Sequence, residues 1–215
     1  MEVNMQEYHK IQTVFKRDPE TKFKTLLIGD FALPEFEYLK NNLWVYTEKV
    51  DGTNIRVLWN GEIVRFGGKT DNASIPSFLL QKLQDRFLGT NNIKLFLEKF
   101  GEDGDVCLYG EGYGAKIQKG GGNYRADQNF VLFDVKIGDW WLRREDVTDV
   151  AKFFDIEIVP VIGEGNLLDM VSIARTGFNS QWGNFLAEGI VARPQVELRT
   201  RSNQRVITKI KYKDF

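Results

Sequence analysis

The stretch that decides the fold reads WVYTEKVDGTNIRVLWNGEIVRF and occupies residues 44–66. It opens with a run of β-branched and aromatic side chains, a composition typical of strands. The chain then turns at Asp51-Gly52 and resumes as a second strand, and Asn60-Gly61 is a strong signal for a hairpin that returns along residues 63–66. The stretch therefore predicts successive strands with antiparallel pairing, and it puts Lys49 at the end of the first strand.

Hydrophobic spacing predicts the remaining elements. Apolar residues fall at helical spacing from Pro76 to Phe87 and from Ile93 to Phe100, and two further helices are expected at residues 144–154 and 167–175. Strands are predicted at Val106–Glu111, Phe130–Ile137, Glu157–Val161, Gly189–Arg193 and Arg205–Lys211. The pattern indicates an α+β fold of mostly antiparallel sheet with helices on its outer faces. Because no repeat or linker divides the chain, we expect residues 1–215 to form a single domain.

Composition bounds the class of protein. The chain is 42% hydrophobic and 27% charged, and it has no apolar run near the roughly 20 residues that cross a bilayer. Its N-terminus lacks the basic start and apolar core of a signal peptide. We therefore expect a soluble, cytoplasmic protein with no membrane partner. The chain has one cysteine, Cys107, which excludes an internal disulfide framework and a zinc site of several cysteines. It has one histidine, His9, which argues against histidine-based catalytic triads and metal sites of several histidines.

Charge is distributed unevenly although the net charge is −1. The stretch from Arg193 to Lys213 has seven basic residues and one acidic residue, a net charge of +6. Such a block is usually a solvated face, but it also suits contacts with phosphates.

Lys49 is the first candidate for chemistry. A lysine amine is protonated at neutral pH, with an ordinary pKa of about 10.4, and it becomes a nucleophile only beside cations or in a desolvated site. Lys49 lies at a strand end before the tight Asp51-Gly52 turn, where the backbone can approach a ligand. Alone, this pattern equally fits a solvent-facing lysine.

Four later segments change that interpretation. A strand ends on Glu111 and runs into a glycine-rich loop, and an apolar strand contains Phe133 followed by an acid. Glu188 begins another apolar strand, and near the C-terminus Lys209, Lys211 and Lys213 alternate with other residues. Alternation predicts that these three lysines share one face of a strand.

Taken in this order, the segments resemble the motifs shared by polynucleotide ligases and mRNA-capping enzymes, and most of all the RNA ligase 2 family of phage-type and related RNA ligases. The resemblance spans Glu48 to Phe215. It implies that Lys49 is the lysine that becomes adenylylated and that Lys209 and Lys211 contact the α-phosphate. It implies metal binding at Glu188. The nucleotide-binding residues that it implies are Glu48, Asp51, Gly52, Asn54, Lys69, Glu111, which binds the ribose hydroxyls, and Phe133, which stacks on adenine.

Lys69 departs from the family pattern. It stands where many relatives have an arginine-threonine pair, and lysine supplies charge without the bidentate fork of arginine. Arg65 or Arg56 could compensate for it.

The resemblance also implies the fold and the reaction. The expected fold has antiparallel sheets flanked by helices with a nucleotide pocket between them. The implied cofactors are ATP and Mg²⁺ or Mn²⁺. Lysyl-AMP forms first, AMP then moves to a 5′-phosphate RNA end, and a 3′-hydroxyl finally attacks that end and releases AMP. The sequence has no Gly-x-x-x-x-Gly-Lys-Ser/Thr loop, so this chemistry differs from that of P-loop enzymes.

Several alternatives stay open. A GTP-dependent capping guanylyltransferase and a minimal DNA ligase use similar chemistry, and a non-catalytic RNA-binding module belongs to a different class. The end of the chain at Phe215 predicts that no C-terminal accessory domain follows. We expect a monomer that acts on RNA ends, among them nicked duplexes, but single strands and broken transfer RNA remain open as substrates.

Overall fold

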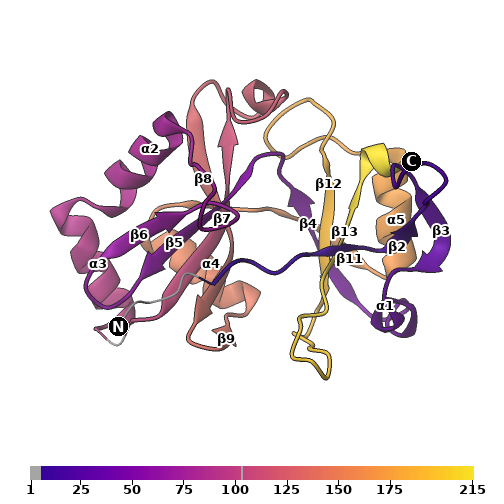
Figure 1. Cartoon of the computed structure of the whole chain (residues 1–215), viewed down its shortest axis with the longest axis horizontal. Coiled ribbons are helices and arrows are strands. Elements are labelled where there is room, and N and C mark those ends of the chain that lie inside the picture. Colours follow the sequence, from indigo (N-terminus) through magenta and orange to yellow (C-terminus); the bar gives the residue numbers. More distant parts are fainter. Residues whose placement is uncertain (1–5, 103) are drawn as a thin grey trace. The chain divides into compact units, whose positions relative to one another are not determined.

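The computed structural model describes residues 6–102 and 104–215, which gather into two compact units (Figure 1). The first unit contains the described part of Met1–His9 together with Asp51–Ile158, and the second contains Lys10–Val50 and Val159–Phe215. The single domain expected from the sequence stays a prediction, and each unit is described by itself.

The first unit is built on a sheet with strand order β10-β8-β7-β5-β6. Its pairs are antiparallel except that of β10 with β8, and the short strand β9 also pairs with β8. The strands are β5 (Thr53–Trp59), β6 (Val64–Gly67), β7 (Val106–Gly114), β8 (Gln128–Ile137), β9 (Trp140–Trp141) and β10 (Glu157–Ile158).

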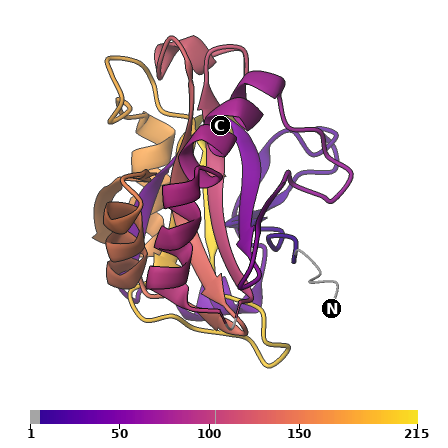
Figure 2. The ribbon, with the colours of Figure 1, turned by 90° about the vertical axis from the view of Figure 1, so that its left-hand side faces the viewer.

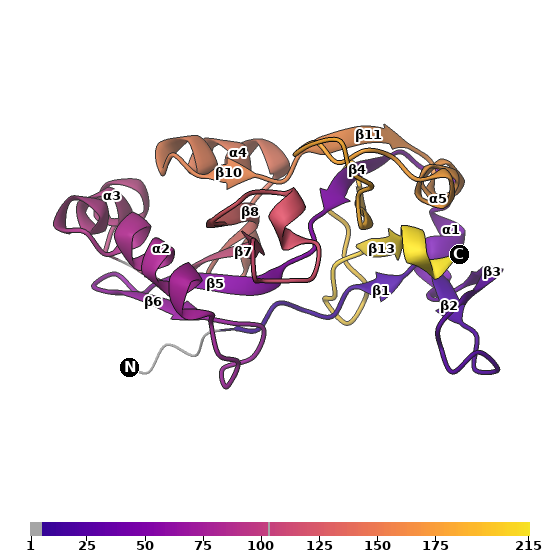
Figure 3. The same ribbon diagram turned by 90° about the horizontal axis from the view of Figure 1, so that it is seen from above.

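Helices cover one face of this sheet. Figure 2 shows the purple and magenta helices α2 (Ser77–Phe87) and α3 (Thr90–Phe100), and Figure 3 shows α4 (Arg144–Phe153) alongside β10. The main core forms between these helices and the sheet, and among its buried side chains are Ile55, Trp59, Leu83, Phe87, Leu132 and Val150. The opposite face of the sheet has a smaller apolar cluster of Leu58, Cys107 and Tyr109.

The second unit has a sheet with strand order β1-β13-β12-β4-β11. The pairing of β1 with β13 is parallel and the others are antiparallel. The strands are β1 (Gln12–Thr13), β4 (Trp44–Lys49), β11 (Val161–Gly165), β12 (Gly189–Pro194) and β13 (Thr208–Lys211), with β2 (Phe15–Arg17) and β3 (Leu26–Phe31) in a separate two-stranded sheet.

One face of the larger sheet packs into the core of the second unit with α5 (Leu167–Thr176). The core contains side chains of alternate strand residues, among them Trp44, Tyr46, Ile190 and Ile210, and of Met170 on α5. Asn166 caps α5 by accepting hydrogen bonds from the amides of Leu168 and Asp169. The remaining elements of this unit are α1 (Pro34–Tyr38) and the short helix η2 (Tyr212–Asp214).

Most predicted elements are confirmed, and the α+β class with antiparallel sheets is correct. The strand predicted at Glu157–Val161 is wrong, because the chain there leaves one sheet at Ile158 and enters the other at Val161. The strand predicted from Arg205 begins later, at Thr208. Among the described residues, no helix is long and apolar enough to cross a bilayer. The expected cytoplasmic location stays a prediction.

Candidate active site

Two lysines flank a glycine across three neighbouring strands of the second unit. Gly189 in β12 pairs with Lys49 in β4 on one side and with Lys211 in β13 on the other. Directly paired residues point to the same face of a sheet, so both lysine side chains lie on the face opposite the core. The position between them requires glycine, because a Cβ on Gly189 would lie 2.2 Å from the carbonyl oxygen of Ile210.

The carboxylate of Glu188 joins these two lysines. Its Oε2 lies 2.5 Å from Nζ of Lys49 and its Oε1 lies 2.5 Å from Nζ of Lys211. The three side chains are mostly buried, with exposed fractions of 10% for Glu188, 19% for Lys49 and 21% for Lys211. Burial raises the pKa of the Glu188 carboxyl, but the two ammonium groups outweigh burial and hold that pKa below its ordinary value. Glu188 is therefore an ionised carboxylate held by two cations.

Lys209 lies on the same face, two residues before Lys211 in β13, and Ile210 between them is buried in the core. The predicted shared face of Lys209 and Lys211 is thus confirmed. The prediction for Lys213 is wrong, because the strand ends at Lys211 and Lys213 lies in η2. The buried Asp214 carboxylate causes the turn by accepting a hydrogen bond from the amide of Lys211 at 2.9 Å.

Glu48 faces the other side of β4. It pairs with Ile190 in the core direction and is 1% exposed. Its carboxylate accepts hydrogen bonds from Oγ of Ser180 at 2.6 Å and from the amide of Gln181 at 2.8 Å. Burial raises the pKa of Glu48 above its ordinary value, and these two bonds offset part of that rise. The structure thus shows Glu48 anchoring the segment that leads to Glu188, and a role in nucleotide binding stays a prediction.

The Asp51-Gly52 turn begins the first unit and is held by the loop that follows β7. Nε2 of Gln118 donates to the carbonyl of Gly52 at 2.9 Å, and the amide of Asp51 donates to the hydroxyl of Tyr124 at 3.1 Å. Gly52 approaches β7 so closely that a Cβ would lie 2.2 Å from the carbonyl oxygen of Gly112. The glycine is required for this approach. The sequence has no signal for Gln118 and Tyr124, because a loop gives no periodic pattern that would mark a contact across the unit.

Asn54 and Glu111 lie directly opposite each other on β5 and β7. They are both partly exposed, and Oδ1 of Asn54 is buried with no hydrogen-bond partner among the described residues. An unused acceptor beside a carboxylate suits a ligand that brings hydroxyl or amino donors.

Phe133 lies at an irregularity in β8. Tyr109 pairs with Asp134 but the next residue, Gly110, pairs with Leu132, so Phe133 is an extra residue in the strand. Leu132 stays in the main core, while Phe133 packs with Tyr109 on the other face of the sheet. The ring of Tyr8 meets Phe133 edge-on, with centroids 5.0 Å apart.

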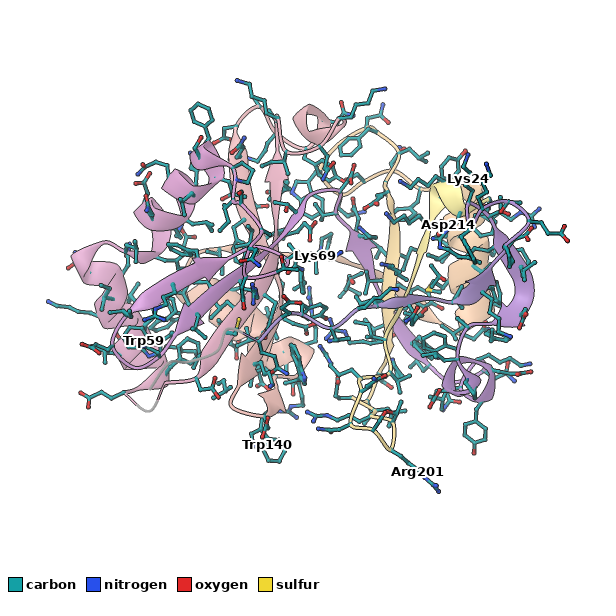
Figure 4. All side chains as sticks on the ribbon, viewed as in Figure 1. Lys24, Trp59, Lys69, Trp140, Arg201 and Asp214 are labelled. Carbon is teal, nitrogen blue, oxygen red and sulfur yellow. The ribbon has the colours of Figure 1, made fainter. Side chains whose placement is uncertain are left out.

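Lys69 is exposed in the turn after β6 (Figure 4). Arg56 is fully buried and holds that turn, with Nε donating to the carbonyl of Gly68 at 2.8 Å and Nη2 to Oδ1 of Asp71 at 2.9 Å. Arg56 therefore supports the turn, and the exposed cations near this turn are Lys69 and Arg65.

The family model for RNA ligase matches residues 42–212. The chain belongs to the RNA ligase family. No curated protein matches the sequence. The fold is similar to that of Naegleria gruberi RNA ligase in several structures, each 16–17% identical to this chain.

Three of these structures illustrate the match. An arginine-to-alanine variant with ATP and Mn has a TM-score of 0.67 over 97% of this chain and 56% of that chain. A lysine-to-alanine variant with ATP and Mn has a TM-score of 0.64 over 100% and 63%, respectively. An apo aspartate-to-alanine variant has a TM-score of 0.64 over 94% and 56%. This chain therefore spans less than two thirds of the Naegleria chains that it resembles.

Proposed function

We propose that this protein is an ATP-dependent RNA ligase that forms lysyl-AMP on Lys49, transfers AMP to a 5′-phosphate RNA end and seals that end to a 3′-hydroxyl. The observation that carries the proposal is the Glu188 carboxylate, which contacts both Lys49 and Lys211 at 2.5 Å. Membership of the RNA ligase family and the likeness to Naegleria ligases solved with ATP and Mn support the same conclusion.

In the first step, the Lys49 nitrogen gives up a proton, leaves Glu188 and attacks the α-phosphorus of ATP. A nitrogen–phosphorus bond forms, the bond from the α-phosphorus to the bridging oxygen breaks, and pyrophosphate leaves with the electron pair. Lys211 and Lys209 lie on the same face as Lys49 and neutralise the charge that develops on the phosphate oxygens. Glu188 orients the Lys49 amine, and the proton that Lys49 loses passes to solvent.

Glu188 would also hold the divalent cation that this chemistry implies. Among the described residues, no three or more histidine, cysteine, aspartate or glutamate side chains form a metal cluster. One carboxylate fits Mg²⁺ or Mn²⁺ nonetheless, because such hard ions keep several waters and bind substrate phosphates. When bound, the cation supplies further neutralisation of phosphate charge.

The first unit provides groups suited to the nucleoside. Glu111 accepts hydrogen bonds from the ribose hydroxyls, Asn54 offers its unused acceptor, and Phe133 stacks on adenine. In the second step, a 5′-phosphate oxygen displaces Lys49 from the AMP phosphorus. In the third, a 3′-hydroxyl attacks the activated 5′-phosphate, loses its proton and expels AMP. We expect a monomer to carry out these steps on RNA ends, including those at a nick.

The test is transfer of label from α-labelled ATP to the denatured chain in the presence of Mg²⁺. We expect label from ATP and none from GTP. Lys49→Arg keeps a cation beside Glu188 but removes the nucleophilic amine, so it should abolish labelling while the unfolding midpoint stays close to that of the wild type. Lys24→Ala, which removes an exposed lysine of the same unit, is the matched control and should label normally.

Other outcomes separate the alternatives. Label from GTP alone would favour a capping enzyme, and no label from either nucleotide would overturn the proposal. Persistent label on Lys49→Arg would assign the nucleophile to another residue. Joining of nicked duplexes with RNA or DNA on the 3′-hydroxyl strand then distinguishes an RNA ligase from a DNA ligase.

A further inference from the structure

Between β12 and β13 the chain forms a projecting hairpin, residues 195–205, which we call the basic hairpin. An isolated bridge pairs Arg199 with Arg205, and the amide of Thr200 donates to the carbonyl of Gln204 at 2.8 Å. Asn203 adopts a left-handed conformation with φ of 61° and closes the turn. Arg201 lies at the tip and points away from the ribbon (Figure 4).

The base of the basic hairpin is braced by a bidentate ion pair. Arg205, with 3% of its side chain exposed, donates from Nε to Oε1 of Glu197 at 2.5 Å and from Nη2 to Oε2 at 3.0 Å. Leu198 packs against the core of the second unit, and the amide of Val206 donates to its carbonyl at 2.9 Å. The tip is therefore presented on a preorganised arm, which lowers the entropy lost when a ligand binds.

The charged side chains in the outer part of the basic hairpin, residues 198–204, are all positive. Residues 198–204 contain Arg199 and Arg201, both exposed, and no acid. Among the described residues, no carboxylate forms an ion pair with Arg201, in contrast to Arg205. The neighbours of Arg201 in the sequence, Thr200, Ser202 and Asn203, also have hydroxyl and amide donors. An unpaired guanidinium with neighbouring neutral donors suits a phosphate group.

We propose that the basic hairpin is a contact arm for the sugar–phosphate backbone of RNA, distant from the joining site. The inference rests on the proposed ligase function and adds to it a substrate length. β12 runs five steps from Gly189, beside Lys49, to Pro194, which is about 17 Å at roughly 3.3 Å per residue. The hairpin continues past the strand end, so its tip lies on the order of 30 Å from Lys49.

In a DNA duplex the charges of one strand are about 3.4 Å apart along the helix axis, and at that spacing this span corresponds to roughly nine nucleotides. The arm therefore contacts the backbone roughly nine nucleotides from the joint, on the 5′-phosphate side or on the 3′-hydroxyl side. Phosphate contacts of this kind fix the position of a strand without reading its sequence.

The first experiment measures RNA binding. Arg201→Ala, Arg201→Glu and the control Arg175→Ala are compared for binding of a fluorescent nicked RNA duplex of 20 base pairs on each side, over a salt series. Arg175 is an exposed arginine on α5, which packs against the opposite face of the sheet. Arg201→Ala should weaken binding by roughly threefold or more and reduce the slope of log affinity against log salt by about 0.7–0.9. Arg201→Glu should weaken binding further, and Arg175→Ala should match the wild type.

The second experiment varies substrate length. The duplex is shortened in steps on the 5′-phosphate side or on the 3′-hydroxyl side. Wild type and Arg201→Ala should become equal once the side that carries the contact is shorter than roughly nine nucleotides, and shortening the other side should not remove the difference. This pattern also identifies which side the arm contacts.

Labelling of Lys49 by ATP separates this proposal from the proposed function. Arg201→Ala should label at the wild-type rate, since its contact is with RNA. Equal RNA affinity of wild type and Arg201→Ala would overturn the proposed contact between the basic hairpin and RNA. So would a loss of affinity in Arg201→Ala that persists on the shortest duplexes. Failure of the wild type to label at all would instead overturn the proposed ligase.

Discussion

Glu48 and Glu188 are both mostly buried glutamates of the second unit, yet their surroundings shift their pKa values in opposite directions. Burial raises the pKa of Glu48, and the hydroxyl and backbone amide that donate hydrogen bonds to it are neutral and offset only part of that rise. Glu188 lies between two ammonium groups, and its pKa is lowered. Burial alone therefore does not decide the protonation of a carboxyl, and the charge of its partners does.

This difference predicts opposite pH dependences of stability. In Glu48 the folded pKa exceeds the unfolded value, so the folded state binds the proton first and the contribution of Glu48 to stability falls as pH rises through that raised pKa. In Glu188 the folded pKa is depressed, so its contribution is present above the ordinary value and is lost as pH falls through the lowered pKa. Urea unfolding of wild type, Glu48→Gln and Glu188→Gln between pH 3 and pH 7 in EDTA measures the contribution of each glutamate to stability.

The free energy of unfolding of the wild type minus that of Glu48→Gln should decrease with rising pH. The corresponding difference between the wild type and Glu188→Gln should increase. Glutamine keeps the shape of each side chain and can still accept the amide of Gln181, so the differences isolate the charge. Parallel curves for the two variants would show that the partners do not control these carboxyls.

At the scale of single residues, the sequence marks the residues proposed to react or to bind a ligand more clearly than the residues that hold them in place. Lys49, Glu188 and Lys211 follow from motifs and strand alternation, and the structure brings them together. Ser180, Gln118 and Tyr124 could not be found, because each holds the site through a hydrogen bond from a loop, and neither composition nor period marks such a partner.

The strands show where periodicity is sufficient and where it fails. β4 and β8 were predicted nearly to the residue, since their runs of apolar and aromatic side chains are long. The segment at Glu157–Val161 was not predicted correctly, because its residues form strands in two different sheets on either side of Pro160. The carbonyl of Pro160 accepts a hydrogen bond from the amide of Glu48. The alternation of side chains along the sequence identifies a strand, whereas the sheet to which the strand belongs depends on partners far away in the sequence.

The extra residue in β8 could not be predicted either, and it gives the strand a second role. It brings Phe133 and Asp134 to the same side as Tyr109, where Tyr8 donates a hydrogen bond of 2.5 Å to the buried Asp134 carboxylate. The segment before β1 is thus fastened to the strand that presents Phe133.

Tyr8→Phe tests this fastening. It keeps the ring that contacts Phe133 but removes a hydrogen bond to a buried carboxylate, so the free energy of unfolding should fall by about 1.5–3 kcal/mol in urea titrations. Tyr38→Phe, at a tyrosine that is 86% exposed, is the control and should change little. Additive effects of Tyr8→Phe and Asp134→Asn would contradict a direct interaction, because interacting residues give a coupling energy.

Across the whole molecule, the candidate residues divide by chemistry between the two compact units. The second unit provides Lys49, Glu188, Lys209 and Lys211, which are charged groups suited to phosphate. The first provides Asn54, Glu111 and Phe133, which are suited to the nucleoside. Sequence predicted both sets but not their division, because the chain enters each unit twice and no linker marks the crossings.

If the proposed function is correct, this division should appear in the kinetics of Lys49 labelling. Phe133→Ala removes stacking worth about 1–3 kcal/mol, which raises the ATP concentration for half-maximal labelling by about fivefold to a hundredfold and leaves the maximal rate close to that of the wild type. Lys211→Met removes charge stabilisation that grows in the transition state, so it should lower the maximal rate by about a hundredfold or more. Single-turnover labelling over a range of ATP concentrations gives both values. Phe78→Ala, at a phenylalanine of the first unit that is 68% exposed, is the control and should change neither. A change in the same kinetic parameter for Phe133→Ala and Lys211→Met would mean that recognition of the nucleoside and stabilisation of the phosphate are not divided in this way.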